Sequence, residues 1–278
     1  METNRNHHPS SRRSTRKTTL KPATSDREKI LQHLDVLMIK LTAETLDQIV
    51  SDGTARGASV WETLERVLAA PSGLKREQAI ASRIRRACFP TEATLESYDW
   101  SFNPSARRQA QVLELATGEF IGRGENVTFV GKSGLGKSHL IEGIGKKCCA
   151  VGHRVLYIKS AMLLDRLNKA RAVRSLPQQV RKLRSYDWLI VDEFGFEKLE
   201  RAEISDALSL FYKVIDARVG RSTAVVTNVD FKDWTEYLGD PQIVMAMLDR
   251  LVHRSQIVKF DGTSYRAASR PKGAGGAE

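Results

Sequence analysis

The chain has 278 residues, of which 41% are hydrophobic and 28% charged, so it is long enough for a sizeable core and a second, smaller module. No apolar run approaches the roughly 20 residues that span a bilayer, and the basic N-terminus lacks the apolar centre of a signal peptide. We therefore expect a cytoplasmic protein without membrane contact. The formal net charge of +11 favours a polyanionic partner.

The excess positive charge is concentrated in two segments. Residues 1–27 contain seven basic and two acidic side chains, and residues 165–184 contain seven basic side chains and one acidic one. The first segment is rich in Ser, Thr, Arg and Pro and has no periodic apolar positions, which predicts a disordered arm. Such an arm would follow DNA phosphates or act as a solubilising tail, and both interpretations stay open.

Residues 28–90 are predicted to form a small helical module. Apolar residues recur at helical spacing over residues 30–49 and again over residues 60–68. A third helix is predicted from Lys75 to Ala87, and arginines surround its apolar positions. Its basic face would contact nucleic acid or a partner, or would be an ordinary solvated face.

From Pro90 the pattern changes to alternating strands and helices, which predicts an α/β domain with a parallel sheet over residues 91–268. Asp261-Gly262 indicates a hairpin-type turn after the last strand. The tail at 269–278 has Gly and Ala without a pattern, so we expect it to be mobile. Strands are predicted at 126–130, 154–159, 187–192, 223–228 and 256–260, and helices near 106–122, 136–151, 160–172, 177–184, 201–218 and 240–253.

The stretch from Gly131 to Ser138 fits the pattern G-x-x-x-x-G-K-[ST] and lies between a predicted strand and a predicted helix. In that context the pattern is typical of a phosphate-binding loop, because glycines let backbone N–H groups approach a pyrophosphate and a helix N-terminus favours an anion. Lys137 would reach the β- and γ-phosphates of ATP, and the Ser138 hydroxyl would ligate Mg²⁺. The residues expected to bind ATP are Gly131, Lys132, Ser133, Gly134, Leu135, Gly136, Lys137, Ser138 and His139.

A second motif is the stretch Asp187–Glu193, in which the apolar run Trp188–Val191 is followed by Asp192 and Glu193. Ligands of parallel sheets bind at the carboxyl ends of such strands. Asp192 would hold Mg²⁺, directly or through water, and Glu193 would orient and deprotonate the attacking water. The next strand ends at Asn228, which would contact the γ-phosphate or position water, or else form a local Asx turn.

Further stretches accompany these two motifs, namely Leu113–Asn126, Asp192–Gly195, Ser222–Asn228, Leu238–Pro241, Leu248–Leu251 and Gly262–Arg266. Together with the phosphate loop, this series resembles the IstB-like transposition helper ATPases, which are AAA+ proteins akin to the DnaC helicase loaders. The resemblance covers residues 91–266 and is looser over 28–90. It implies an AAA+ P-loop NTPase core, with a parallel sheet flanked by helices, preceded by a small all-helical N-terminal module.

The resemblance also implies roles for single residues. Asn228 occupies the sensor position, and Arg250 matches the arginine that this clade supplies to the ATP of a neighbouring subunit. Such an arginine stabilises charge on the transferred phosphoryl group, so hydrolysis would depend on a homo-oligomer, either a ring or a helical filament. Pairing with Asp249 or a solvated helix face is the alternative for Arg250. Arg266 would be a second phosphate sensor, although no lid helices follow it.

The basic segment 165–184 lies where the resembling family places DNA-contacting helices. Its Lys and Arg side chains would bind phosphate without choosing a sequence, and a solvated face is the alternative. Trp100 and Phe102 align with the segment that leads into the ATPase core, where they would flank the adenine or simply pack. The expected DNA contacts are Arg166, Lys169, Arg171, Arg174, Arg181 and Lys182.

The function implied by the resemblance is that of an ATP-dependent helper. Its site for ATP hydrolysis would be completed in trans between subunits. It would assemble on double-stranded DNA, recruit and activate a transposase, and disassemble when ATP is hydrolysed. Two other functions stay open on the sequence. One is a replicative helicase loader, which would prefer single-stranded DNA, and the other is a P-loop protein in which the nucleotide is only a structural ligand.

Overall fold

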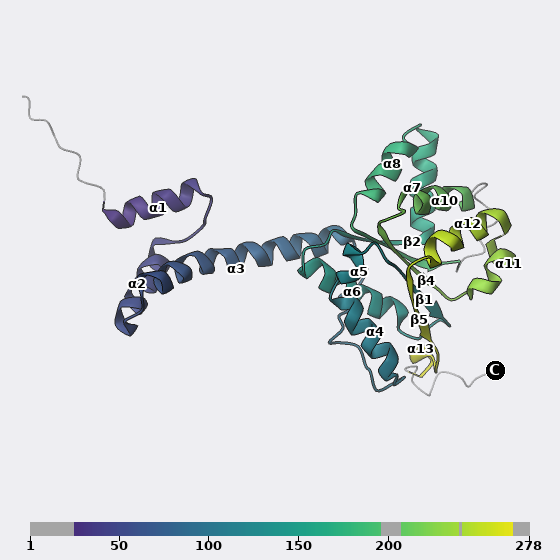
Figure 1. Cartoon of the computed structure of the whole chain (residues 1–278), viewed down its shortest axis with the longest axis horizontal. Coiled ribbons are helices and arrows are strands. Elements are labelled where there is room, and N and C mark those ends of the chain that lie inside the picture. The colour runs from purple at the N-terminus through teal and green to yellow at the C-terminus, as the bar shows by residue number, and fades with distance from the viewer. Residues whose placement is uncertain (1–24, 196–206, 239–240, 269–278) are drawn as a thin grey trace, which may run out of the picture. The chain divides into compact units, whose positions relative to one another are not determined.

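The structure is a computed structural model that describes residues 25–195, 207–238 and 241–268 (Figure 1). Residues 1–24 of the predicted arm, the predicted tail at 269–278 and the predicted helical residues 201–206 lie outside these ranges. The chain divides into two compact units, the first ending at Lys75 and the second beginning at Arg76. Within the described ranges, no helix is both long and apolar enough to cross a membrane.

The first unit contains α1 (Asp26–Val36), α2 (Ala43–Arg56) and the N-terminal part of α3 (Val60–Ala87). Helix α1 begins inside the predicted arm, because Ser25 and Glu28 form a capping box in which each side chain accepts the other residue's backbone N–H. The three helices pack around a small apolar cluster. Its buried members are Leu34, Leu46, Ile49 and Val67.

Helix boundaries in this part of the chain differ from the predicted ones. The single helix expected over 30–49 is two helices, because Thr42 caps the start of α2 with its side chain. The helices expected over 60–68 and 75–87 are one helix, α3, which continues through Pro71. Proline usually ends or kinks a helix because it lacks a backbone donor, and here it does not end it.

The second unit is built on a five-stranded parallel sheet in the order β2-β3-β4-β1-β5. This confirms the predicted parallel α/β class, and the strand bounds differ from the predicted ones by at most two residues. The expected hairpin-type turn at Asp261-Gly262 is wrong, because within the described residues β5 is followed by the short helix at 265–268 and not by a strand that could pair with it. The strands are β1 (Asn126–Gly131), β2 (Val155–Lys159), β3 (Trp188–Phe194), β4 (Ser222–Thr227) and β5 (Ser255–Phe260).

Helices cover both faces of the sheet (Figure 1). The helix expected over 106–122 is interrupted at Gly118, whose φ of 80° is left-handed. Helices α4 (Ala106–Ala116), α5 (Glu119–Gly122) and α6 (Lys137–Ala150) cover one face. The other face is covered by α7 (Ser160–Ala172), α8 (Leu176–Arg184), α10 (Ala207–Ala217), the 3-10 turn η1 (Phe231–Asp233), α11 (Trp234–Leu238) and α12 (Pro241–Val252). Helix α13 (Tyr265–Ala268) follows β5.

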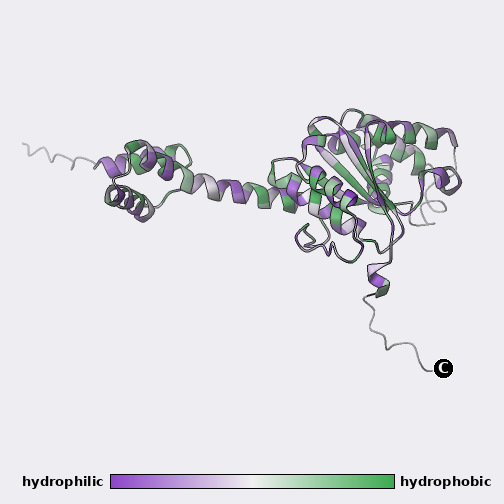
Figure 2. Ribbon diagram, turned by 60° about the horizontal axis from the view of Figure 1, so that its bottom comes forward, coloured by the Kyte–Doolittle hydropathy of each residue, from purple (hydrophilic) through white to green (hydrophobic). Residues whose placement is uncertain are grey.

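Alternate residues of each strand belong to opposite layers of the core. In β3, Trp188 and Ile190 belong to the cluster beneath α4 and α6, whereas Leu189 and Val191 belong to the cluster beneath α7, α10 and α12. Strands buried on both faces are apolar along most of their length, which explains the apolar runs in the sequence. The helices instead mix hydrophobic and hydrophilic residues along their length (Figure 2), as elements with one buried side do.

A buried arginine ties α8 to β4. The guanidinium of Arg218, which is 1% exposed, donates to the carbonyl oxygens of Leu183, Tyr186 and Ser222 and to the hydroxyl of Thr223. All four acceptors are neutral, and burial lowers the pKa of Arg218 to about 9, which leaves it protonated at neutral pH. The side chain therefore satisfies polar groups that would otherwise be buried without a donor.

We expect Arg218→Met to lower the free energy of unfolding by about 3 kcal/mol, because it leaves these buried oxygens without a donor. Urea denaturation followed by circular dichroism measures this. The matched control is Arg221→Met, whose side chain is 46% exposed and pairs with Asp187, and which should cost less than about 1 kcal/mol. Equal losses in the two variants would contradict the assignment.

Candidate nucleotide-binding site

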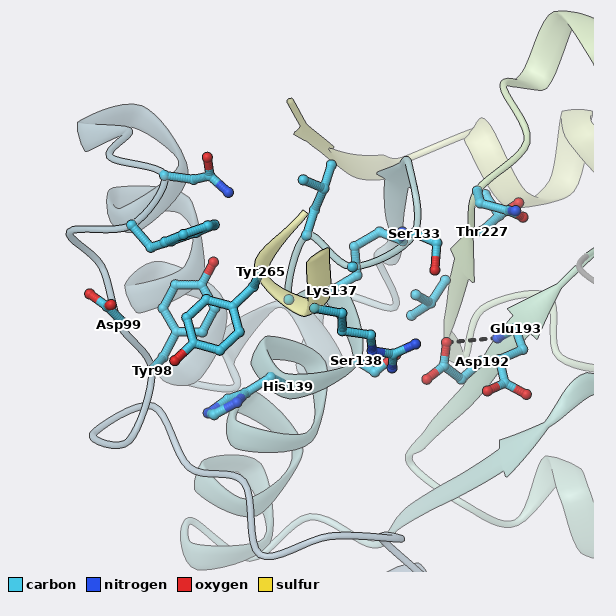
Figure 3. Close-up of a pocket in the computed structure, with 18 of the residues that line it drawn as sticks. Tyr98, Asp99, Ser133, Lys137, Ser138, His139, Asp192, Glu193, Thr227 and Tyr265 are labelled. Carbon is cyan, nitrogen blue, oxygen red and sulfur yellow. Dashed lines mark hydrogen bonds between the residues drawn. The ribbon is translucent and has the colours of Figure 1, made fainter. Parts of the chain in front are cut away.

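A cavity of about 410 Å³ lies at the carboxyl ends of β1, β3 and β4, where parallel sheets bind their ligands. The loop after β1 and the start of α6 form its floor (Figure 3). The end of β3 borders it on one side, and residues 97–99, 102–103 and 265–266 border it on the other. A volume of this size suits a nucleotide-sized ligand.

The loop between β1 and α6 has the conformation of a phosphate cradle. Gly134 and Gly136 both have a φ of 81°, and a Cβ on them would lie 2.1 Å from Ser264 Oγ and 2.6 Å from the Tyr98 ring, respectively. Glycine is therefore required at both positions for conformation and for space. Gly136 is the N-cap of α6, and within the described part of the chain no side chain caps this helix. Its first backbone N–H groups suit an anion.

Lys137 is 8% exposed and is held inside the loop. Its Nζ donates to the carbonyl oxygens of Gly131, at 2.5 Å, and Lys132, at 2.7 Å. Burial lowers the pKa of Lys137 to about 8; the positive charge of Arg266 acts in the same direction, and the negative charge of Asp192 opposes both. The ammonium group thus has internal partners that a phosphate group would replace.

Asp192 is buried at the end of β3 (Figure 3). Its Oδ2 accepts a hydrogen bond from the Tyr157 hydroxyl on β2, and its Oδ1 accepts the backbone N–H of Glu193 at 2.7 Å. The pairing of β3 with β4 shifts register between Val191 and Phe194, and Glu193 has a left-handed φ of 57°. Such irregularities redirect side chains beside functional sites. Here they bring the two consecutive carboxylates to the cavity.

The Glu193 carboxylate also has an internal partner. Its Oε1 accepts from Lys159 Nζ at 2.8 Å, and both side chains are partly exposed. Lys159 is the last residue of β2 and pairs with Asp192 across the sheet. The Ser160 hydroxyl donates to the Glu193 carbonyl oxygen at 2.9 Å and fixes the strained backbone. A water molecule that approached the carboxylate would compete with the Lys159 ammonium.

The oxygen donors at this end of the cavity suit Mg²⁺. The Ser138 hydroxyl and the Asp192 carboxylate both line the cavity. Mg²⁺ prefers oxygen ligands and keeps several waters, so one or two protein ligands suffice. The hydrogen bonds that Asp192 accepts leave lone pairs for a metal or a metal-bound water. Ser138 and Asp192 would hold the ion, which would neutralise charge on the β- and γ-phosphates.

The opposite side of the cavity is aromatic. Tyr98, Phe102 and Tyr265 line it, and the rings of Phe102 and Tyr265 meet edge to face at 4.9 Å. Trp100 does not line the cavity; it packs against the core and contacts the Tyr98 ring at 4.8 Å. Of the two predicted aromatic residues, only Phe102 therefore borders the site. Flat rings of this kind suit a nucleobase.

Two segments distant in sequence close this aromatic side. The Asn103 side chain donates to the Thr263 carbonyl at 2.9 Å and accepts the Thr263 backbone N–H at 3.2 Å, although the residues are 160 positions apart. The Tyr265 backbone N–H donates to the carbonyl of Gly134 in the phosphate loop at 2.9 Å. The segment after β5 is thus bonded both to the loop and to the segment before α4, and Arg266 enters the cavity from it.

Most of the predicted nucleotide-binding residues border the cavity. Residues 133–139 line it, while Gly131 and Lys132 contribute the carbonyl oxygens that hold Lys137. The His139 ring bonds to the Thr94 carbonyl at 2.9 Å and so fixes the segment before Tyr98. Asn228 lines the cavity beside Asp192 and Glu193, as expected if β3 and β4 are neighbours.

Arg250 is not among the residues that line this cavity. Its carbonyl oxygen accepts from the Asn126 side chain at the start of β1, whereas the phosphate loop begins at Gly131, the end of that strand. The two ends of β1 are roughly 15–20 Å apart. Its Nε donates to Asp216 on α10 at 2.7 Å, so the alternative partner Asp249 is wrong. Arg250 therefore lies at the opposite edge of the sheet from its own chain's site.

The basic residues predicted to contact DNA lie on α7, on α8 and in the turn between them, and all are exposed. Lys169 pairs with Asp165 at 2.7 Å, one turn earlier on α7. The other side of both helices packs into the core through leucines such as Leu167 and Leu183. The outer surface, called the basic face here, consists of Arg166, Lys169, Arg171, Arg174, Arg181 and Lys182.

The residues at the site that were not predicted include four with aromatic or charged side chains, namely Tyr98, Tyr157, Lys159 and Tyr265. The aromatic segment before α4 was identified through Phe102, but nothing in the sequence separates Tyr98 from the neighbouring Trp100. Tyr265 lies in the stretch Gly262–Arg266, which pointed only to Arg266. Tyr157 and Lys159 are on the strand beside β3, and their contacts with Asp192 and Glu193 depend on the strand order.

Comparison with known proteins identifies the family. Residues 32–273 match the family of IstB-like ATP binding proteins. An insertion sequence IS21 protein of Pseudomonas aeruginosa, named for ATP binding, is 32% identical over 247 residues, which cover 87% of this chain and 91% of that one. An insertion sequence IS232 protein of Bacillus thuringiensis, named likewise, is 30% identical over 240 residues, which cover 86% and 94%.

A solved structure supports the fold independently. Domain III of the Thermotoga maritima replication initiation protein DnaA matches with a TM-score of 0.50 at 20% identity, over 62% of this chain and 68% of that one. The likeness concerns the fold alone, and it agrees with the AAA+ P-loop core that the sequence resemblance implied. The chain belongs to the IstB-like ATP binding protein family.

Proposed function

We propose that this protein is an ATP-dependent helper of transposition that forms a homo-oligomer on duplex DNA, recruits and activates a transposase, and disassembles when ATP is hydrolysed. One observation carries the proposal. Each chain has a phosphate loop and two carboxylates at one edge of its sheet, while Arg250 lies at the opposite edge. An arginine placed there does not reach the ATP of its own chain, and it would serve the ATP of a second copy. The names of the insertion-sequence relatives support a role in transposition.

The charged groups of the free site have internal partners that ATP would replace. Lys137 would exchange the carbonyl oxygens of Gly131 and Lys132 for the β- and γ-phosphates. Glu193 would take a proton from the attacking water once its ion pair with Lys159 opens. Asn228 would position that water or the γ-phosphate. ATP bound between two copies would therefore stabilise the assembly, and its hydrolysis would end it.

The basic face on α7 and α8 would provide the DNA contacts. Exposed Lys and Arg side chains neutralise phosphates in any sequence and release counterions, which gives an affinity that falls steeply with salt. These helices follow β2 directly, and β2 carries Lys159, the partner of Glu193. DNA bound at this face would thus lie one helix away from the catalytic carboxylate.

We expect Glu193→Gln to keep ATP binding and to lower the rate of hydrolysis about a hundredfold or more, because an amide cannot accept the proton. The variant should therefore accumulate as an oligomer on duplex DNA in the presence of ATP, as measured by light scattering and electron microscopy. Lys137→Ala, which loses its phosphate contact, is the control and should not assemble. Failure of Glu193→Gln to form an ATP-dependent oligomer would refute the proposal, and assembly on single strands alone would favour a helicase loader.

Replacing Arg181 and Lys182 together with Gln should weaken duplex binding equally for unrelated sequences. Two lost phosphate contacts should also reduce the slope of log affinity against log salt by about 2. Fluorescence anisotropy over a salt series measures both effects. The control replaces Lys213 and Lys232, which are exposed basic residues outside the basic face, with Gln. An equal slope change in both double variants would mean that the basic face is only a solvated surface.

The affinity for ATP should fall as the pH rises through about 8. Phosphate binds the charged form of Lys137, whose pKa burial lowers to about 8. The affinity for ATP is therefore highest below that pH, and above it the lysine must take up a proton when ATP binds. Calorimetry in two buffers of different ionisation enthalpy measures this uptake. Arg266→Gln removes a charge that lowers this pKa and should move the midpoint to higher pH. An affinity that stays constant between about pH 7 and 9 would contradict the assignment.

A further inference from the structure

Two residues of α10 restrain the guanidinium of Arg250. Its Nε donates to Asp216 Oδ1 at 2.7 Å, and its Cζ lies 4.9 Å from the centroid of the Tyr212 ring. Tyr212 and Asp216 are one helical turn apart and therefore lie on the same face of α10. Helix α12 packs against that face. The ring and the carboxylate thus hold one arginine side chain from two directions.

These contacts leave one end of the guanidinium available. Besides the bond from Nε, Nη1 donates to the carbonyl of Ala246 at 3.1 Å. Within residues 25–195, 207–238 and 241–268, Nη2 has no hydrogen-bond partner. The Arg250 side chain is 28% exposed. A guanidinium binds phosphate through a planar pair of N–H groups, and the terminal N–H groups of Nη1 and Nη2, which point away from Nε, are such a pair.

A restrained arginine loses less conformational entropy than a free one when two copies assemble. An unrestrained arginine has several rotatable bonds, and fixing them at a subunit interface costs conformational entropy. Here Asp216 and Tyr212 fix the side chain before a second copy arrives. The Asp216 contact is on the Nε edge, so it leaves the terminal edge between Nη1 and Nη2 uncovered. The arrangement is therefore one of preorganisation.

We propose that Asp216 and Tyr212 are positioning residues that hold Arg250 in the conformation in which it contacts the ATP of a second copy. This inference rests on the proposed function, in which Arg250 acts in trans. Neither residue lines the cavity of its own chain, so both act through Arg250 and do not touch the nucleotide bound there. Asp216 supplies direction through its hydrogen bond, and Tyr212 supports the plane of the guanidinium through its ring.

The first test compares single variants of the full chain on duplex DNA. Asp216→Ala and Tyr212→Leu should lower kcat about tenfold or more, while the affinity for ATP and the thermal melting temperature change little. Asp216→Asn and Tyr212→Phe, which keep an acceptor and a ring, should recover part of the rate. Asp249→Asn, an exposed acid beside Arg250 on α12, is the matched control and should turn over normally. A rate increase in Asp216→Ala would overturn the proposal, since it would mean that Asp216 withholds the arginine.

The second test asks on which side of the interface Asp216 acts. Glu193→Gln subunits have an inactive site and an intact arginine, whereas Asp216→Ala subunits would have an intact site and a misplaced arginine. In an equal mixture about a quarter of the head-to-tail interfaces join an intact site to an intact arginine. The mixture should therefore hydrolyse ATP faster than either variant does alone. An absence of recovery would show that Asp216 acts within its own chain and would overturn the proposal.

The variant Arg250→Ala distinguishes the role of Arg250 from the positioning role of Asp216 and Tyr212. It should retain ATP binding and lose turnover more fully than Asp216→Ala, and it should be complemented in the same mixture with Glu193→Gln. Normal turnover in Arg250→Ala would refute the role of Arg250 itself, and with it the proposed two-copy site. Lost turnover in Arg250→Ala with normal turnover in Asp216→Ala and Tyr212→Leu would refute only the positioning role.

Discussion

The parallel direction of the five strands is the constraint on which the site depends. Because all strands run the same way, the residues that follow β1, β3 and β4 meet at one edge of the sheet, and the strand order makes these three neighbours. The phosphate loop, the carboxylates Asp192 and Glu193, and Asn228 come together for this reason. The same direction sends Arg250, near the start of β1, to the far edge.

The free site satisfies its own charges. Lys137 bonds to loop carbonyls, Asp192 to the Tyr157 hydroxyl and a backbone N–H, and Glu193 to Lys159. Buried charged groups without partners are costly, so such contacts stabilise the folded protein before a ligand arrives. They also mean that a ligand must replace existing bonds. The affinity for a nucleotide and the rate of its hydrolysis would then depend on how easily these internal bonds break. The bonds of the free site would differ from those of the nucleotide-bound site.

At the far edge of the sheet, contacts with a neighbouring helix hold an arginine in place. Arg250 is fixed by residues of the neighbouring helix and contributes nothing to the cavity of its own chain. In the proposed function, a site divided in this way would connect nucleotide chemistry to assembly, because two copies would have to meet before all charged groups surround one phosphate. The basic face on α7 and α8 adds a surface on which several copies would be collected. In the proposed function, these features make ATP hydrolysis a measure of assembly.

The sequence by itself determined the elements and motifs that few consecutive residues encode. Apolar runs located all five strands, and the glycine pattern located the loop from Gly131 to Ser138, because both signals are local. It misjudged the helix boundary at Thr42, where a side-chain cap starts a new helix, and the turn after β5, where a short helix follows and not a partner strand. Only the tertiary structure decided that Tyr98 and Tyr265 border the cavity, that Lys159 pairs with Glu193, and that Asp216 holds Arg250. These residues are far apart in the chain, and their contacts depend on strand order, on the register shift in β3 and on helix packing, which no local pattern contains.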